Sequence, residues 1–123
     1  MIRNPALLPK VRSRALLDAV QHMPCTLRLA SFAGMSCAGQ DTVVPCHLAT
    51  IGKGTSTKVS DLFVAAGCCA CHDLLDGRNT VGLAISLQHP AAWGRRILDA
   101  MAETQSRWVE MGVLHDDRWE VIG

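Results

Sequence analysis

The pattern of apolar and polar positions predicts a chain of mixed helices and short strands. In residues 11–21, apolar side chains recur at helical spacing among Arg12, Arg14 and Asp18, which predicts an amphipathic helix. The helix should end before Pro24, because the residue preceding a proline avoids the α region.

Two stretches downstream of this helix predict strands. Residues 25–29 alternate between apolar and polar side chains, and residues 42–48 are β-branched and apolar. Pro45 places the second stretch at the edge or end of a sheet, since proline cannot donate a ladder hydrogen bond. Residues 31–41 are rich in Gly and Ser and predict a loop, whereas residues 61–67 form a short apolar connection.

The C-terminal part predicts the longest helix. Pro90 suits a first helical turn, and Gly112 suits a helix end. Between them, large side chains repeat every three or four residues, a stripe that usually packs against a core: Trp93, Ile97, Met101, Gln105 and Trp108. Residues 83–87 are expected to be extended, and a turn near Asp116 precedes a last strand at 119–122.

Size and composition indicate one domain. The 123 residues, of which 49% are hydrophobic, can bury a modest core. We divide the chain into an arm and helix at 1–24, a central part at 25–80, and a helix and strand at 88–123. No apolar run approaches the length of a membrane span, so no membrane partner is expected. The core is poor in aromatic side chains, and a bound metal would help to stabilise it.

The first residues and the cysteine content bear on location. Residues 1–10 contain Pro5 and Pro9 and predict an extended arm, without the apolar segment of a secretory signal. Six cysteines without such a signal are typical of a reducing compartment, where thiolates more often bind metals than form disulfides. We therefore expect a cytoplasmic protein.

The net charge of +1 hides an uneven distribution. Residues 1–58 carry seven basic and two acidic side chains, and residues 59–123 carry five basic and nine acidic ones. A basic half can attract phosphate, although an ordinary solvated surface explains the charges equally well. The basic loop at 51–58 lacks the spacing of a nucleotide-binding phosphate loop.

The segment from Cys68 to Arg78 carries the clearest chemical signal. Cys68 and Cys71 form a Cys-x-x-Cys pair, whose two thiolates can reach one tetrahedral zinc ion. His72 and Asp76 are four residues apart, so on a helix they project from the same face and could hold a second metal. That helix should end near Gly77.

The same residues also spell Cys-x-x-Cys-His, the attachment signature of c-type haem. Covalent haem attachment normally follows export, and the chain shows no export signal, so zinc is the better interpretation.

A structural zinc ion needs four ligands. Cys25 and Cys37, with eleven residues between them, offer a second pair, and four thiolates would make a closed structural site. Cys46 and Cys69 compete for these positions. Cys69 lies between two proposed ligands, where geometry usually points it away, and Cys46 could be a buried apolar side chain instead.

The order of these features resembles that of HNH (ββα-metal, His-Me finger) endonucleases, and more closely that of the small YbcO-like family of prophage nucleases. The likeness runs from about residue 23 to 78 and rests on pieces that are specific in their order: Pro24-Cys25-Thr26-Leu27-Arg28, Thr42-Val43, His47-Leu48, Gly52-Lys53-Gly54, Lys58 with Asp61, Ala70-Cys71-His72-Asp73 and Asp76-Gly77-Arg78.

The resemblance implies an α+β fold, a ββα-metal domain with a structural zinc ion and a long C-terminal helix. It implies hydrolysis of DNA phosphodiester bonds, with His47 as the general base for water. His72 helps to hold a divalent metal, Mg²⁺ or Mn²⁺, and Asp76 falls where many relatives have a second ligand. Two departures accompany the likeness: Cys46 stands where many HNH enzymes have a His or Asp ligand, and Asp61 is the nearest candidate for the middle Asn.

Other interpretations of these residues stay open. Lys53, Lys58 and Arg78 are candidate phosphate contacts, and solvated surface is equally plausible for them. Asp76 could simply pair with Arg78, and His47 alone would more often be a hydrogen-bonded structural residue. The remaining histidines are expected at the surface: His22, His89 and His115. The main alternative function is a non-catalytic, zinc-stabilised module that binds DNA or protein, and a partner in DNA recombination or repair is unknown.

Overall fold

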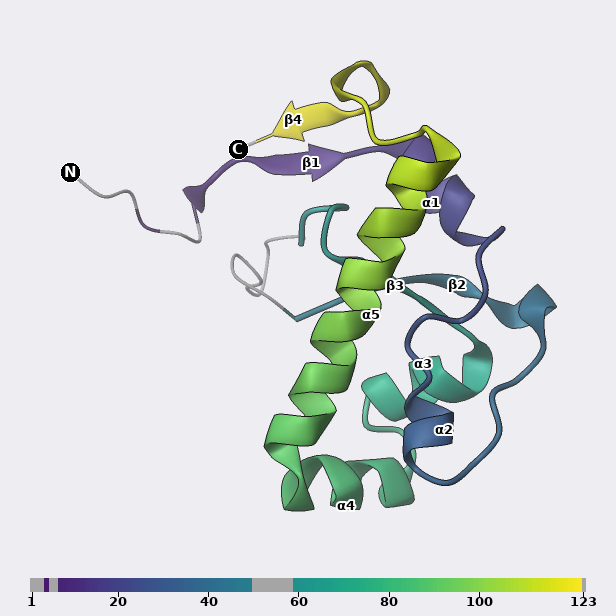
Figure 1. Cartoon of the computed structure of the whole chain (residues 1–123). Helices are drawn as coiled ribbons and strands as arrows, with labels where there is room; N and C mark the ends of the chain where they lie inside the picture. The colour runs from purple at the N-terminus through teal and green to yellow at the C-terminus, as the bar shows by residue number, and fades with distance from the viewer. Residues whose placement is uncertain (1–3, 5–6, 50–58, 123) are drawn as a thin grey trace.

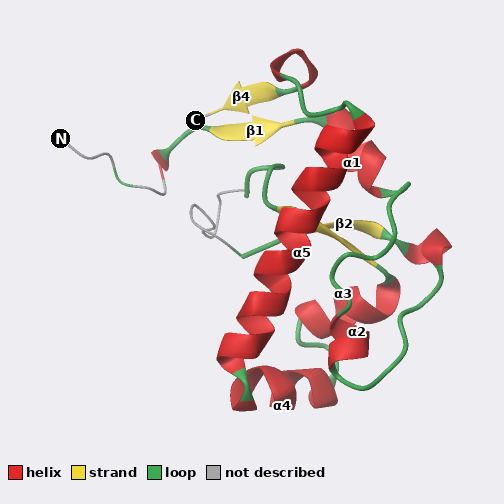
Figure 2. Cartoon of the chain, in the orientation of Figure 1, coloured by secondary structure: helices red, strands yellow, loops and turns green. Residues whose placement is uncertain are grey.

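The computed structural model describes residues 4, 7–49 and 59–122 (Figure 1). Helices dominate, and the strands form two separate pairs (Figure 2). The elements follow one another as β1 (Lys10–Arg12), α1 (Arg14–Val20), α2 (Leu29–Phe32), a 3₁₀ helix (Gln40–Thr42), β2 (Val44–His47), β3 (Val64–Gly67), α3 (Cys69–Leu75), α4 (Thr80–Gln88), α5 (Pro90–Met111), a second 3₁₀ helix (Asp116–Arg118) and β4 (Glu120–Ile122).

Strands β2 and β3 pair in antiparallel fashion, and α3 follows β3 almost directly. His47, the last residue of β2, lies opposite Val64, and Val44 lies opposite Gly67. The backbone N–H of Leu48 donates to the carbonyl of Phe63 at 2.9 Å and extends the pairing by one step. The order strand, strand, helix thus places His47 at one end of the hairpin and the start of α3 at the other.

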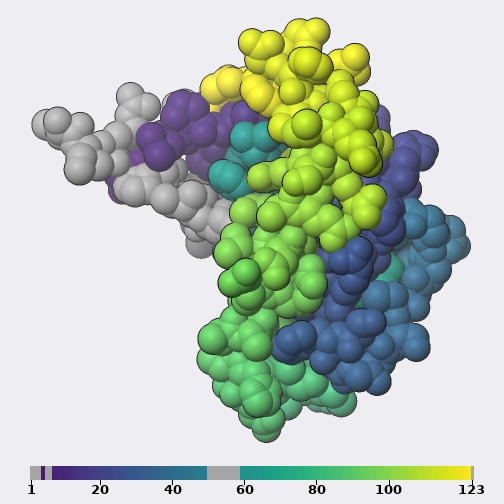
Figure 3. All heavy atoms as spheres, in the orientation of Figure 1, coloured from purple at the N-terminus to yellow at the C-terminus, as the bar shows by residue number. Residues whose placement is uncertain are grey.

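Helix α5 is the longest element of the described chain and runs along the molecule (Figure 1). It contacts β3, α1 and α4, and its side chains run across the face seen in Figure 3. The expected stripe is confirmed as core, since Trp93 and Trp108 are buried and Ile97 and Met101 pack against the core. The indole N–H of Trp108 donates to the carbonyl of Leu16 at 3.0 Å, so this buried polar group is satisfied.

The beginning and the end of the described chain form the second strand pair. β1 and β4 are antiparallel, with Val11 opposite Val121. The predicted helix at 11–21 therefore begins later, at Arg14, because Ser13 caps it: the Ser13 hydroxyl accepts a hydrogen bond from the backbone N–H of Leu16.

The predicted strand at 25–29 is wrong. The backbone N–H groups of Thr26 and Leu27 both donate to the carbonyl of Ala66, at 2.8 and 3.0 Å, so the segment crosses the end of β3 instead of running along it. Arg28 then adopts φ 47°, in the left-handed region that an extended strand cannot contain. Helix α2 begins at Leu29.

The extended structure predicted at 83–87 is also wrong, because these residues lie in α4. The Asn79 side chain accepts hydrogen bonds from the backbone N–H groups of Val81 and Gly82, which starts a helix. A Cβ built on Gly82 would overlap the Leu74 side chain, so glycine allows α4 to pack closely on α3. The apolar connection at 61–67 proves to contain β3, and its four strand residues are all buried.

The predicted ends of two helices, near Gly77 and Gly112, are confirmed. Gly77, with φ 72°, follows the end of α3, and Gly112, with φ 73°, caps α5. The basic loop at 51–58 lies outside the described residues. Within the described part, no helix combines the length and the apolar character that crossing a membrane requires.

We predict opposite effects of adding a methyl group at two glycines. A Cβ at Gly67 would lie 2.6 Å from Cys46 Sγ and 2.8 Å from Leu27 Cδ1, so Gly67→Ala should destabilise the zinc-loaded protein by about 1–3 kcal/mol. At Gly94 in α5 nothing lies within 4 Å, so Gly94→Ala should stabilise it by about 0.5–1 kcal/mol. Urea unfolding measures both, and equal midpoints for the two variants would contradict the packing described here.

Candidate functional site

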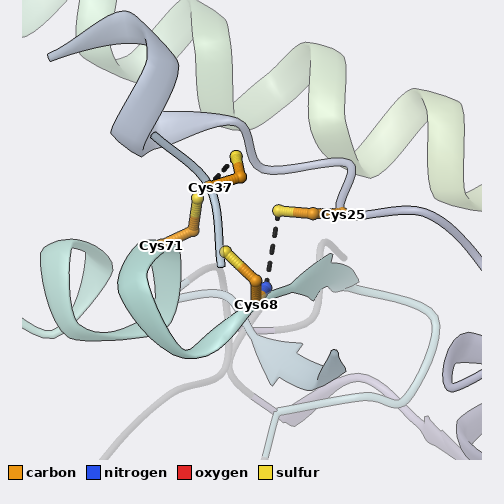
Figure 4. A group of neighbouring side chains, drawn as sticks. All are labelled: Cys25, Cys37, Cys68 and Cys71. Atoms are coloured by element: carbon orange, nitrogen blue, oxygen red, sulfur yellow. Dashed lines mark hydrogen bonds between the residues drawn. The ribbon is translucent and has the colours of Figure 1, made fainter. Parts of the chain in front are cut away.

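Four cysteine side chains meet between α2 and α3 (Figure 4). The sulfur atoms of Cys25, Cys37, Cys68 and Cys71 all lie within 4.8 Å of one another, and those of Cys37 and Cys71 are 3.6 Å apart. A tetrahedral zinc ion with Zn–S distances of about 2.3 Å requires sulfur separations of about 3.8 Å. The donor set, its spacing and its closed arrangement therefore fit a structural zinc ion.

Three segments of the chain supply these ligands. Cys25 precedes the segment that crosses β3, Cys37 lies in the loop after α2, and Cys68 and Cys71 come from the start of α3. Cys68 and Cys71 are buried, whereas Cys37 is exposed. A zinc ion bound here would thus hold together the loop that contains Cys37 and the starts of α2 and α3.

Backbone N–H groups surround the sulfur atoms. Cys25 Sγ accepts from the N–H of Cys68 at 3.4 Å, Cys68 Sγ from that of Ala38 at 3.3 Å, and Cys71 Sγ from that of Ala30 at 3.4 Å. Such donors stabilise negative charge on metal-bound thiolates and orient the ligands.

The cluster also determines the protonation of its thiols. A hydrogen bond with Cys71 lowers the pKa of Cys25 to about 5, and the same contact raises the pKa of Cys71 above its usual value. Burial raises the pKa of Cys37. Four thiolates this close together repel one another, so full ionisation of the cluster requires a bound cation.

The two competing cysteines lie outside the cluster. Cys46 is buried, and burial together with the nearby charge of Asp76 raises the pKa of its thiol to about 12. It is therefore a protonated, apolar side chain at neutral pH. Cys69 is exposed, and its backbone N–H donates to the Thr42 hydroxyl at 3.0 Å. Both positions agree with the geometry expected from the sequence.

His47 forms a hydrogen-bonded pair with Asp61. His47 Nε2 lies 2.8 Å from Asp61 Oδ1, and 39% of the His47 side chain is exposed, against 6% for Asp61. The second carboxylate oxygen of Asp61 accepts from the backbone N–H of Ser13 at 2.8 Å, and Arg12 Nη1 lies 3.8 Å from Oδ1. Ser13, the residue after β1, thus holds in place the Asp61 carboxylate that pairs with His47 on β2.

His72 and Asp76 lie on one face of α3, as their spacing predicts. His72 Nε2 is 3.2 Å from Asp76 Oδ2, and about a third of each side chain is exposed. Arg78 reaches back along α3 to pair with Asp73 Oδ1 at 3.2 Å and with Asp76 Oδ2 at 3.3 Å. The pairing of Asp76 with Arg78, one of the two interpretations open from the sequence, is therefore present.

The structure brings some of the predicted residues together and leaves others apart. In the described part of the chain, the four cysteines are the one set of three or more potential metal ligands that lie this close, and neither His47 nor His72 belongs to it. Lys53 and Lys58 lie outside the described residues. The three histidines expected at the surface are exposed: His22, His89 and His115.

Sequence reasoning missed one contact that positions the cluster. Arg28, three residues after Cys25, makes a two-pronged ion pair with Glu103 of α5, with distances of 2.7 and 3.0 Å. This pairing lowers the pKa of Glu103, and Arg107 also donates to its carboxylate. Because the two residues are 75 positions apart, no local sequence pattern predicts this contact.

A family model described as "Putative nuclease YbcO" matches residues 14–113.

The chain belongs to the YbcO nuclease family.

Two relatives illustrate the similarity. The Escherichia coli (strain K12) protein named "Putative nuclease YbcO" is 32% identical over 100 residues, which cover 80% of this chain and 95% of the relative. The "Putative nuclease ybcO" of Enterobacteria phage 82 shows the same identity and coverage. No solved structure matches the chain significantly.

The YbcO match includes the cysteine cluster, His47, Asp61 and the candidate residues of α3. It leaves out β1 and β4, which lie before and after the matched range. The resemblance to the YbcO-like family inferred from the sequence is thereby confirmed, and β2, β3 and α3 lie inside the matched region.

Loss of one cluster thiol should release the metal and loosen this YbcO family protein. We expect Cys71→Ser to lose bound zinc and to unfold at a lower temperature, because zinc binding contributes folding free energy. Cys69→Ser is the matched control, since Cys69 neighbours the cluster but stays outside it. Zinc content by mass spectrometry and melting temperature should differ between the two variants. Full zinc content and unchanged melting in Cys71→Ser would refute this ligand set.

Proposed function

We propose that this chain is a metal-dependent HNH-type endonuclease that hydrolyses DNA phosphodiester bonds. Membership of a family named for nuclease activity supports the reaction class. The order β2, β3, α3, with His47 at the end of β2 and His72 on α3, supports the HNH type. The observation that carries the mechanism is the hydrogen bond between His47 and Asp61.

His47 is the proposed general base. An ionised carboxylate can only accept hydrogen bonds, so the 2.8 Å contact with Asp61 places the imidazole proton on Nε2. In this tautomer Nδ1 keeps its lone pair and can accept a proton. Because the side chain is partly exposed, we propose that a water molecule beside it transfers a proton to Nδ1 as its oxygen attacks phosphorus.

Asp61 is the proposed orienting residue for this base. Its side chain is buried, and its two oxygens face different partners, His47 on one side and the Ser13 backbone N–H on the other. The Asp61 backbone N–H also donates to the carbonyl of Val11 at 2.9 Å. Both ends of the Asp61 residue are therefore fixed by residues 11–13, and this holds the imidazole ring in one orientation.

His72 and Asp76 would hold the divalent cation, Mg²⁺ or Mn²⁺. Two adjacent ligands at about 2.1 Å from an octahedral ion lie about 3.0 Å apart, close to the 3.2 Å between His72 Nε2 and Asp76 Oδ2. Such an ion, when bound, binds the scissile phosphate and stabilises charge on the leaving oxygen. The four-cysteine cluster leaves no ligand position open, so its zinc ion would be structural.

Basic side chains would supply contacts with the phosphate backbone. Arg78 lies beside the proposed cation ligands on α3, and Lys53 and Lys58 belong to the basic segment between β2 and β3. Contacts of this kind provide most of the non-specific affinity for DNA.

Replacing His47 should abolish cleavage without affecting the fold. We expect His47→Ala to reduce Mg²⁺- or Mn²⁺-dependent nicking of supercoiled plasmid by about 10²–10⁴-fold, the usual contribution of a general base. His22→Ala is the control, because His22 is exposed and distant in sequence from the proposed site. Zinc content is measured for each protein. No nicking by any of them at full zinc content would favour the non-catalytic binding module instead.

Replacing Asp61 by Asn should reduce the turnover number more than the apparent substrate affinity. The amide can still accept a hydrogen bond from His47, but its own N–H₂ can turn toward Nε2 and favour the wrong tautomer. We expect nitrogen-15 NMR of the imidazole to show mainly the Nε2–H form in the wild type and a mixture in Asp61→Asn. An unchanged tautomer together with unchanged cleavage would argue against an orienting role.

A further inference from the structure

Arg78 lies at a backbone position that the end of α3 determines. Gly77 has φ 72°, its N–H donates to the carbonyl of Leu74 at 3.2 Å, and the Arg78 N–H donates to the carbonyl of Asp73 at 3.0 Å. This pair of hydrogen bonds is a Schellman motif, which reverses the chain after a helix. The reversal directs the Arg78 side chain back along α3.

The guanidinium group of Arg78 bridges two carboxylates. Nη1 lies 3.2 Å from Asp73 Oδ1, and Nη2 lies 3.3 Å from Asp76 Oδ2. The oxygen that Nη2 approaches is the same one that lies 3.2 Å from His72 Nε2. One carboxylate oxygen thus faces both a guanidinium and an imidazole.

A divalent cation on His72 and Asp76 would compete with Arg78 for this oxygen. Bringing a dication within about 2.1 Å of Asp76 Oδ2 places it close to the positive guanidinium, and the two charges repel. Asp73 offers Arg78 a second anchor that does not involve the cation ligands. Arg78 can therefore give up Asp76 and stay beside the site through Asp73.

We propose that Arg78 changes partner when the cation binds, from the Asp76 carboxylate to a phosphate oxygen of the nucleic-acid backbone. The proposal rests on the proposed function, because it needs His72 and Asp76 as cation ligands. Guanidinium groups suit both partners, since their planar set of donors matches carboxylate and phosphate alike. Arg78 then hinders cation binding in the free protein and couples it favourably to DNA binding.

The coupling follows from linkage. If Arg78 is released by the cation and then held by phosphate, cation and DNA each raise the affinity for the other by the same factor. The side chain is 63% exposed, so its contact with Asp76 is weak and the effects should be modest. A protein in which Arg78 merely finishes α3 would show no such coupling.

The first test measures cation affinity without DNA. Zinc-loaded His47→Ala protein, which should not cleave, is titrated with Mn²⁺ and followed by electron paramagnetic resonance. Adding Arg78→Gln should tighten Mn²⁺ binding by roughly two- to fivefold, the range expected for an exposed ion pair. Adding Arg95→Gln should leave it unchanged, because Arg95 pairs with Asp99 on α5 and does not touch the site.

The second test measures DNA affinity with and without Mn²⁺ in the same proteins. Mn²⁺ should strengthen binding of a short duplex when Arg78 is present, and this gain should shrink at least twofold in Arg78→Gln. Equal Mn²⁺ affinity and an equal gain in both proteins would overturn the proposal while leaving the nuclease assignment intact.

A control separates this failure from that of the proposed function. Asp76→Asn should weaken Mn²⁺ binding strongly if Asp76 is a ligand. Mn²⁺ binding that is unaffected by Asp76→Asn would overturn both the cation site and the role of Arg78. Zinc content and melting temperature are compared across all variants, so that loss of the fold is recognised.

Discussion

The central constraint on this structure is the repulsion among four closely spaced cysteine thiolates, which a bound cation would relieve. Cys25, Cys37, Cys68 and Cys71 lie within 4.8 Å of one another, an arrangement that four thiolates cannot hold without a cation. Their segments have little regular structure apart from α3. A zinc ion would therefore stabilise this region in place of a larger hydrophobic core. It would also fix the position of the start of α3 relative to β3.

A second set of contacts holds the candidate histidine of β2. The backbone of Val11 in β1 and of Ser13, the residue after β1, holds Asp61, and Asp61 holds His47. These contacts join backbone groups of residues 11–13 to Asp61, so they do not require particular side chains at residues 11–13. This explains how β1 can lie outside the region matched to the YbcO family and still support a residue inside it. A zinc ion in the cluster would thus hold the start of α3, while hydrogen bonds from residues 11–13 hold Asp61 and, through it, His47.

The sequence was sufficient where local chemistry decides the outcome. Cys-x-x-Cys spacing, the four-residue step from His72 to Asp76 and the glycine ends of helices all act over one turn, and each is observed. Prediction from the sequence failed where contacts between distant residues determine the local structure. Residues 25–29 alternate like a strand, but hydrogen bonds to Ala66 and the left-handed Arg28 prevent one. Asp61 stood out only through the family likeness, because its link to Ser13 joins residues 48 positions apart.

The pairing of β1 with β4 has a consequence for how the protein is made. Val11 lies opposite Val121, so the pairing of the last described strand with the first joins residues 110 positions apart. Contacts so distant in sequence form late, and a chain still being synthesised cannot form this one until β4 has left the ribosome. Until then β1 lacks its partner strand, and the Ser13 hydroxyl lacks the Arg118 carbonyl to which it donates. The segment whose backbone holds Asp61 is therefore among the last parts of the fold to be fixed in place.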